Sequence, residues 1–358
     1  MCKFAKKSEG LEKVDFLIIG QGIAGSLLAH ELLERGCSVL VTDPEHTATS
    51  SMKAAGIYNP ITGRKMVKTW LADLLFQGLE AYYRSLEQHY HCHVLHPRPI
   101  YRPFVSVAEQ NDWQGRAASP DYQPYIDELM VSSLGIPVIY DPHGGLKIKP
   151  SGHVDLPTLL EAIKKSLKSM GIFRSESYNY QELETQDDRV VYRDIIAKKI
   201  ICCEGPAATT NPYWKYLPFR LVKGEIMNIE ADLPKDIILN RGVFVLPVHG
   251  IFRVGSTYDH KTLDFIPSPQ GIKKLEEGLS KTFHGKYRIL EAFAGVRPAT
   301  YDRKPFIGLH PENPQVGIFN GFGTKGVSLV PFFAKQFVTY LLQENKLMPE
   351  VDINRVNE

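Results

Sequence analysis

Residues 15–43 read DFLIIGQGIAGSLLAHELLERGCSVLVTD. The apolar run 16–19 does not alternate with polar residues, which is typical of a strand buried on both faces of a parallel sheet. Leucines then recur at helical spacing until Gly36, where a helix would take its left-handed C-terminal cap. A second apolar run, 39–41, ends at Asp43. The pattern predicts a strand, a glycine turn, a helix and a second parallel strand.

The turn GQGIAG has the glycine spacing that the pyrophosphate of a dinucleotide requires. Gly20 allows a tight turn out of the strand, Gly22 lets the backbone approach the phosphates, and Gly25 lets the helix pack close to the sheet. Ile23 and Ala24 open the helix, whose positive N-terminal end attracts an anion. Glycines also serve plain turns, so the prediction depends on the strand and helix on either side.

Asp43 stands at the end of the second predicted strand. An acid at this place accepts hydrogen bonds from the adenosine ribose hydroxyls and disfavours NADP, whose 2′-phosphate would meet a negative charge. The alternative is a solvated Asp before Pro44 in an ordinary turn. The unit does not separate FAD from NAD, because both present an ADP moiety to it.

The composition is that of an ordinary globular protein. The 358 residues include 42 Lys and Arg against 40 Asp and Glu, so the net charge of +2 gives no global field for nucleic acid or an acidic membrane. The five cysteines show no C-x-x-C spacing and no nearby histidine pattern suited to zinc, so we expect reduced thiols, no metal site and a cytoplasmic protein. We find no signal-peptide pattern and no run of roughly 18 apolar residues that a spanning helix needs.

The rest of the chain alternates strands with helices, and a strand, glycine turn and helix recur near the C-terminus. The expected elements are helices at 71–90, 156–170 and 327–342, strands at 200–203 and 317–319, and a β-hairpin over 243–255 that turns near His249.

Five segments in order resemble the successive signatures of the D-amino-acid-oxidase-like FAD-dependent oxidoreductases. Within that family the chain most resembles the glycine oxidases and the oxidase domain of the tRNA-wobble-uridine-modifying enzymes. The segments are GQGIAG at 20–25, SSMKAAGI at 50–57, GVRP at 295–298, DRKPFIG at 302–308 and GFGTKGV at 321–327.

This resemblance implies an α/β (α+β) fold with a Rossmann-like FAD-binding domain that is discontinuous in sequence. A second domain, built on an antiparallel β-sheet, binds the substrate. The implied FAD-binding segments are 12–85, 150–220 and 290–358, and the substrate-binding segments are 86–149 and 221–289. The implied cofactor is noncovalent FAD, because no cysteine lies near Arg297.

The resemblance also assigns cofactor-binding residues. Those in the last glycine-rich turn would place a helix N-terminus beside the pyrimidine edge of the flavin, where negative charge develops on reduction. The Lys325 side chain would add a positive charge there, or would simply face solvent. The implied residues are Gly20, Gly22, Ile23, Ala24, Gly25, Asp43, Ser50, Ser51, Ala55, Gly56, Ile57, Gly205, Gly323, Thr324, Lys325, Gly326 and Val327.

Arg297 matches the position that binds the substrate carboxylate in amino-acid-oxidising relatives, where a guanidinium pairs bidentately with the carboxylate. A structural salt bridge is the alternative. Tyr258, His260 and Tyr101 are weaker candidates for lining the substrate pocket. Three basic residues depart from the family pattern and have no assigned role, namely Lys53, Arg64 and Lys65.

The implied activity is oxidation of a small amine or amino acid by hydride transfer to the flavin, with Arg297, Thr324 and Lys325 at the reacting centre. The implied partner is therefore a small molecule rather than a nucleic acid. Two alternatives remain. One is a tRNA-modifying flavoenzyme that acts on a carboxymethylaminomethyl group, and the other is a non-enzymatic flavin-binding subunit.

Overall fold

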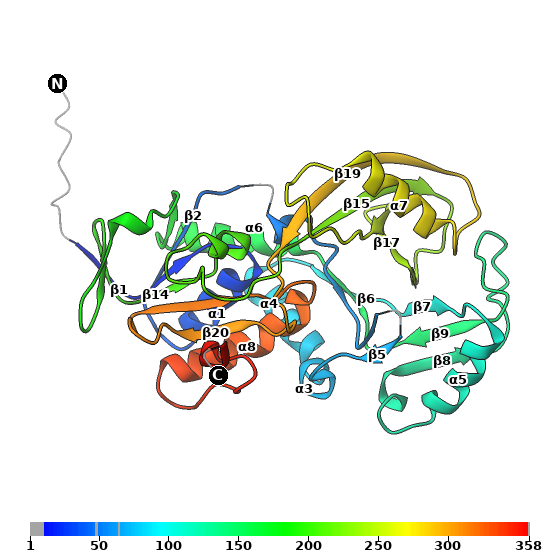
Figure 1. Cartoon of the computed structure of the whole chain (residues 1–358), viewed down its shortest axis with the longest axis horizontal. Coiled ribbons are helices and arrows are strands. Elements are labelled where there is room, and N and C mark those ends of the chain that lie inside the picture. Colours follow the sequence, from blue (N-terminus) through cyan, green and yellow to red (C-terminus); the bar gives the residue numbers. More distant parts are fainter. Residues whose placement is uncertain (1–10, 47–48, 64, 357–358) are drawn as a thin grey trace.

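Two eight-stranded sheets form the framework of the molecule (Figure 1). The computed structural model describes residues 11–46, 49–63 and 65–356. We call the sheet that contains β1 (Glu12–Ile19) sheet 1, and the sheet that contains β15 (Val222–Ala231) sheet 2. They lie at opposite ends of the elongated molecule in Figure 1.

Sheet 1 has a parallel centre. The strands β11, β2, β1, β14 and β21 run parallel in that order, while β13, β12 and β20 join antiparallel. Their bounds are β2 Val39–Asp43, β11 Phe173–Ser175, β12 Leu183–Thr185, β13 Val190–Tyr192, β14 Ile195–Cys202, β20 Phe306–Leu309 and β21 Val316–Asn320.

The apolar run of β1 is buried on both faces, as the sequence predicts. Phe16 and Ile18 join the core that the helices α1 (Ile23–Glu34) and α8 (Gly326–Leu341) build on one face. Leu17 and Ile19 join a separate core on the other face. The predicted strand, turn, helix and strand are therefore all present, and Gly36 takes the left-handed conformation after α1 with φ +74°.

Sheet 2 has the order β19-β15-β18-β17-β16-β7-β9-β8 and is antiparallel except between β16 and β7. The helix α7 (Pro269–Leu279) packs on one face of it. The predicted hairpin is present as β17 (Val243–Val248) and β18 (Ile251–Gly255). The other strands are β7 Ile100–Pro103, β8 Ile126–Met130, β9 Gly145–Ile148, β16 Ile238–Arg241 and β19 Tyr287–Arg297.

Short elements fill the region between the sheets. A three-stranded sheet contains β3 (Ile57–Tyr58), β10 (Gly152–Val154) and β6 (Leu95–Pro97), and β4 (Ile61–Thr62) pairs with β5 (Val67–Lys68). The remaining helices are α2 Ser50–Lys53, α3 Ala72–Phe76, α4 Leu79–Tyr90, α5 Val107–Ala117 and α6 Leu156–Ser169.

The helix predictions are confirmed, with one difference. The single helix expected over 71–90 is two helices, α3 and α4, with Gly78 at the junction as the N-cap of α4. The helix α6 begins as predicted, with Asp155 accepting a hydrogen bond from the Thr158 N–H at 3.3 Å. Among the described residues, none of the helices combines the length and the apolar character needed to span a bilayer. The division into two discontinuous domains stays a prediction.

Candidate active site

The turn after β1 has room for glycine only at two of its positions. A Cβ on Gly20, which has φ +99°, would lie 2.6 Å from the Cys203 carbonyl oxygen, and a Cβ on Gly25 would lie 1.9 Å from the Gly20 carbonyl oxygen. Gly22 is the N-cap of α1 and brings no side-chain cap, and the first turn of α1 carries no acid. The positive end of α1 is therefore open to an anion.

Asp43 serves the turn itself. Its Oδ2 accepts a hydrogen bond from the Gln21 N–H at 2.8 Å, and its Oδ1 accepts one from the Glu45 N–H at 2.7 Å. The turn-stabilising role left open by the sequence is thus present. The predicted contact with a ribose stays a prediction, since each carboxylate oxygen keeps a second lone pair.

Two serines connect α2 to the turn and to sheet 2. Ser51 Oγ accepts a hydrogen bond from the N–H of Ile23 at 3.1 Å, at the start of α1. Ser50 Oγ donates to the carbonyl oxygen of Val296, near the end of β19. The helix α2 thus holds the end of β19 beside the first turn of α1.

The loop that follows α2 lies with its backbone against β10. Gly56 has φ +68°, and a Cβ there would lie 1.9 Å from the Val154 carbonyl oxygen. Its own carbonyl accepts a hydrogen bond from the Val154 N–H at 2.9 Å. Ala55 precedes it and Ile57 begins β3, so three predicted cofactor residues follow one another on a fixed, small-residue backbone.

The second glycine-rich turn opens α8 directly beside the start of α1. A Cβ on Gly326 would lie 3.4 Å from Ile23 Cγ2, and Gly323, with φ +54°, donates its N–H to the Pro298 carbonyl oxygen at 3.2 Å. Thr324 is exposed and Val327 is buried in the first turn of α8. The two helix N-termini, which are far apart in the sequence, therefore lie side by side.

Lys325 is partly buried beneath this turn. Its Nζ lies 3.3 Å from Thr69 Oγ1. Burial, and then repulsion from Arg303, lower the pKa of the Lys325 ammonium to about 8. The side chain is thus neither a freely solvated lysine nor one half of an ion pair with any of the residues described. Thr69 carries no motif, so the sequence could not identify it.

Gly205 lies at the carboxyl end of β14. It has φ +57°, opens a short 3-10 helix (Gly205–Thr209), and accepts a hydrogen bond from Asn320 Nδ2 at 2.9 Å through its carbonyl. Cys203, the residue that follows β14, lies with its backbone against Gly20. Gly205 therefore belongs to the same edge of sheet 1 as the first glycine turn.

Arg297 ends β19 and carries a guanidinium without a carboxylate partner among the described residues. Its Nη1 donates to the Thr257 carbonyl oxygen at 3.3 Å, and its Cζ lies 5.1 Å from the ring centroid of Tyr258. Gly224 on the paired strand makes room for it, because a Cβ there would lie 2.0 Å from Arg297 Nη2. Burial lowers the pKa of Arg297. The structural salt bridge that the sequence left open is not the arrangement found.

The weaker pocket candidates differ in their surroundings. Tyr101 is fully buried, and its hydroxyl donates to Asp141 Oδ2 at 2.6 Å in the core beneath α7, so its prediction as a pocket residue is wrong. The cause is strand alternation, which places Tyr101 on the packed face of sheet 2. His260 is exposed with Nδ1 2.9 Å from the Leu221 carbonyl oxygen. Tyr258, 64% exposed, lies over Arg297.

The basic residues that depart from the family pattern have different positions. Lys53 ends α2, and its Nζ lies 5.5 Å from the ring centroid of Phe293 on β19, whose ring also meets Arg253 at 5.1 Å. Lys65 is exposed. Arg64 lies outside the described residues.

A cavity of about 250 Å³ adjoins the loop after α2. Ala54 and Ala55 form one wall, the start of α6 another, and Arg253 of sheet 2 a third. Arg253 Nε donates to Asn228 Oδ1 at 3.2 Å. The cavity thus lies between the loop expected to pass a flavin and the sheet expected to bind the substrate.

These features together fit an anionic dinucleotide. Two open helix N-termini, two serine hydroxyls and a turn in which only glycine fits converge on one edge of sheet 1. Arg297, whose guanidinium contacts no carboxylate among the residues that the structure describes, directly follows Val296, which α2 holds through Ser50. The residues predicted to bind an anionic cofactor and the arginine predicted to bind a carboxylate are therefore adjacent.

Comparisons with known proteins agree with this geometry. The model of the family described as "FAD dependent oxidoreductase" (DAO) matches residues 15–340. The bifunctional protein MnmC of tRNA 5-methylaminomethyl-2-thiouridine biosynthesis from Legionella pneumophila (strain Corby) is 22% identical over 382 residues, which cover 95% of this chain and 56% of that protein. The chain thus spans about half the length of this curated relative.

Two solved structures share the fold. Glycine oxidase from Geobacillus kaustophilus has a TM-score of 0.70 at 17% identity, covering 94% of this chain and 96% of that one. Iminodiacetate oxidase from Chelativorans sp. BNC1 has a TM-score of 0.76 at 20% identity, covering 93% of this chain and 97% of that one. The resemblance expected from the sequence motifs is confirmed.

Proposed function

Because the chain belongs to the FAD-dependent oxidoreductase family, whose model matches most of its length, we propose that it oxidises a small amine that carries a carboxylate, held by Arg297. The observation that carries this proposal is the partly buried guanidinium with no carboxylate partner among the described residues. A buried cation is stabilised by a partner with opposite charge, and a substrate carboxylate supplies one.

The cofactor would lie along the edge of sheet 1. FAD supplies the acceptor for the hydride that leaves the carbon next to the substrate amine. The residues that would hold its pyrophosphate are Gly22 and Ile23 at the N-terminus of α1, with Ser50 and Ser51 of α2 beside them. The donors for the phosphate oxygens would be the Gly22 N–H and the Ser51 hydroxyl, because the Ile23 N–H donates to Ser51 Oγ and the Ser50 hydroxyl donates to the Val296 carbonyl.

The N-terminus of α8 would stabilise negative charge at the flavin edge of the site. Its open N–H groups near Thr324 and Gly326 and the positive end of the helix are fixed before any substrate arrives. Lys325 adds a full positive charge below pH 8 and loses it above, since its pKa is about 8. Arg297 orients the substrate from the opposite side, through sheet 2.

An anaerobic screen of amines, read by bleaching of the flavin absorbance, tests the proposal. Glycine, sarcosine, proline and D-amino acids form the carboxylated set, and amines of similar size without a carboxylate form the control set. We expect bleaching in the first set and little in the second. Equal reduction by both sets would contradict a role for Arg297 in substrate choice.

A second candidate acts on a tRNA base. It is favoured by the match to the tRNA-modifying relative over 95% of this chain. A carboxymethylaminomethyl group on the base would offer Arg297 the same carboxylate beside an amine. Retention on a tRNA column that falls steeply with salt, together with flavin bleaching by tRNA bearing that group, would favour this candidate. Bleaching by free amino acids without retention would favour the first.

A further inference from the structure

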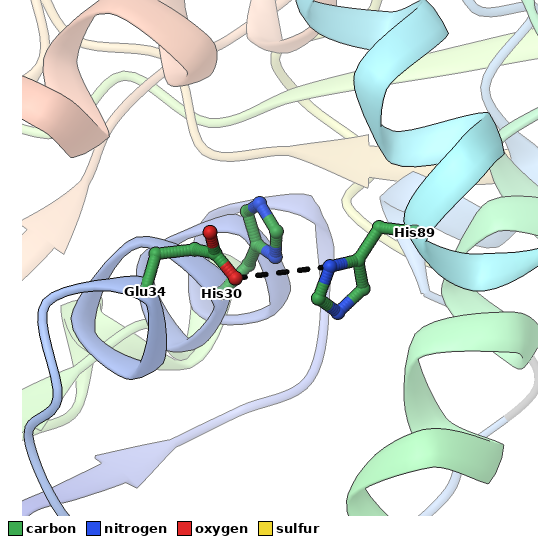
Figure 2. Close-up of side chains that lie close together, drawn as sticks. All are labelled: His30, Glu34 and His89. Atoms are coloured by element: carbon green, nitrogen blue, oxygen red, sulfur yellow. Dashed lines mark ion pairs between the residues drawn. The ribbon is translucent and has the colours of Figure 1, made fainter.

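A cluster of two histidines and a glutamate lies on α1 and α4, apart from the glycine turns. His30 and Glu34 are four residues apart on α1, so they share one face of the helix. His89 comes from the last turn of α4. Figure 2 shows the three side chains converging, with a dashed line that joins the carboxylate of Glu34 to the ring of His89.

We propose that His30, Glu34 and His89 bind a divalent transition-metal ion, with Zn²⁺ as the best match to the ligand set. Each residue offers one ligand atom, and these atoms all lie within 4.8 Å of one another. Glu34 Oε1 lies 3.7 Å from His89 Nδ1. Tetrahedral zinc bonds of 2.0–2.2 Å place neighbouring ligand atoms about 3.4 Å apart, so a small side-chain movement closes the site.

The ligand types suit the ion. Imidazole nitrogen and carboxylate oxygen are ligands that Zn²⁺ prefers, and three protein ligands leave a fourth position for water. Glu34 and His89 are exposed, so the ion can enter from solvent. The pair at four-residue spacing on one helix and a third ligand from another helix form a chelate that neither helix could provide alone.

The surroundings fix the buried ligand. His30 is 8% exposed, its Nδ1 lies 3.0 Å from the Tyr90 hydroxyl, and its ring meets that of His89 edge-on at 5.0 Å. The contact of Nδ1 with Tyr90 leaves Nε2 of His30 as the nitrogen that can face the ion. The nearby ammonium of Lys335 on α8 lies over the Tyr82 ring, 4.7 Å from its centroid.

The metal would join α1 to α4. We expected no metal site because the cysteines lack a zinc-binding spacing, and this cluster contains no cysteine. His30 comes seven residues after Ile23, the first residue of α1, which is about 10 Å along the helix axis. The ion would therefore be separate from the end of α1 that is proposed to bind phosphate. The inference is independent of the proposed oxidase activity.

Titration of the full, flavin-containing chain with ZnCl₂ after chelator treatment, followed by calorimetry, tests the proposal. We expect one Zn²⁺ per chain, and a melting temperature that rises with Zn²⁺. His89→Ala and Glu34→Gln should each weaken binding by about ten-fold or more, since both remove a ligand. Both side chains are exposed, so neither change should unfold the protein.

Two matched variants locate the site. His284→Ala removes an exposed histidine in the loop between α7 and β19, and His93→Ala removes the histidine that pairs with Glu87 at 3.0 Å near the end of α4. Both should bind Zn²⁺ as the wild type does. Absence of binding in the wild type, or unchanged affinity in His89→Ala, would overturn the proposal, and loss of binding in His93→Ala alone would assign the ion elsewhere.

Discussion

Replacing Arg297 by methionine keeps most of the side-chain volume and removes the charge. A guanidinium has five N–H donors, and the contact with Thr257 uses one, so four remain, of which a bidentate carboxylate takes two. Hydrogen bonds to charged groups contribute about 1.5–3 kcal/mol each, so two at the lower value give about 3 kcal/mol. At 1.4 kcal/mol per factor of ten, kcat/KM for a carboxylated amine should fall about 100-fold.

Gly224→Ala tests the same geometry without removing the charge. The new Cβ would lie 2.0 Å from Nη2 and 2.2 Å from Cζ of Arg297, so the guanidinium must move. Gly224 does not have a positive φ, so the substitution adds little backbone strain. We expect a loss of kcat/KM in the same direction as for Arg297→Met, with the flavin content unchanged.

Stopped-flow reduction of the flavin under anaerobic conditions measures both variants. The best carboxylated substrate from the screen is compared with an amine of equal size that lacks the carboxylate. The reduction rate with the neutral amine should be nearly insensitive to Arg297→Met. If both substrates lose rate equally, or neither does, Arg297 does not bind the carboxylate and the reasoning is refuted.

Three further outcomes follow from the site and the core. Gly25→Ala should yield protein without bound flavin by absorbance, because the Cβ would lie 1.9 Å from the Gly20 carbonyl oxygen and the backbone must move. Between pH 8 and 10.5 the unfolded Lys325 keeps a proton that the folded one has lost, so the free energy of unfolding of the wild type should rise with pH relative to Lys325→Met, measured by urea unfolding. Tyr101→Phe should destabilise the fold by about 1.5–3 kcal/mol through the lost bond to Asp141, with kcat and KM unchanged; a changed KM would return Tyr101 to the pocket.

The sequence predicted the first crossover well because several local signals agree there. The apolar run, the glycines and the cap at Gly36 each act within a few residues, and the parallel pairing of β1 with β2 needs only the helix between them. The break between α3 and α4 at Gly78 was harder to predict, because a glycine inside a helical pattern is often tolerated.

The surroundings of Arg297 could not be predicted in the same way. Gly224 faces it only because β15 and β19 pair with Val222 opposite Arg297, and that register joins residues more than 70 positions apart. The motif identified the arginine, while the space that it occupies depends on long-range strand pairing. Tyr101 was misplaced for a related reason, because alternation fixes which face a strand residue takes only once the register is known.

The residues at the end of β19 connect the segments proposed to bind the cofactor with the arginine proposed to bind the substrate carboxylate. Arg297 pairs within sheet 2, while the carbonyl of Val296 accepts a hydrogen bond from Ser50 and the carbonyl of Pro298 accepts one from Gly323. Val296, Arg297 and Pro298 therefore set the position of the guanidinium relative to α2 and to the glycine-rich turn before α8, the two segments proposed to bind the cofactor. Because the contacts of Val296 and Pro298 use backbone carbonyls, they do not depend on the side chains of these two residues.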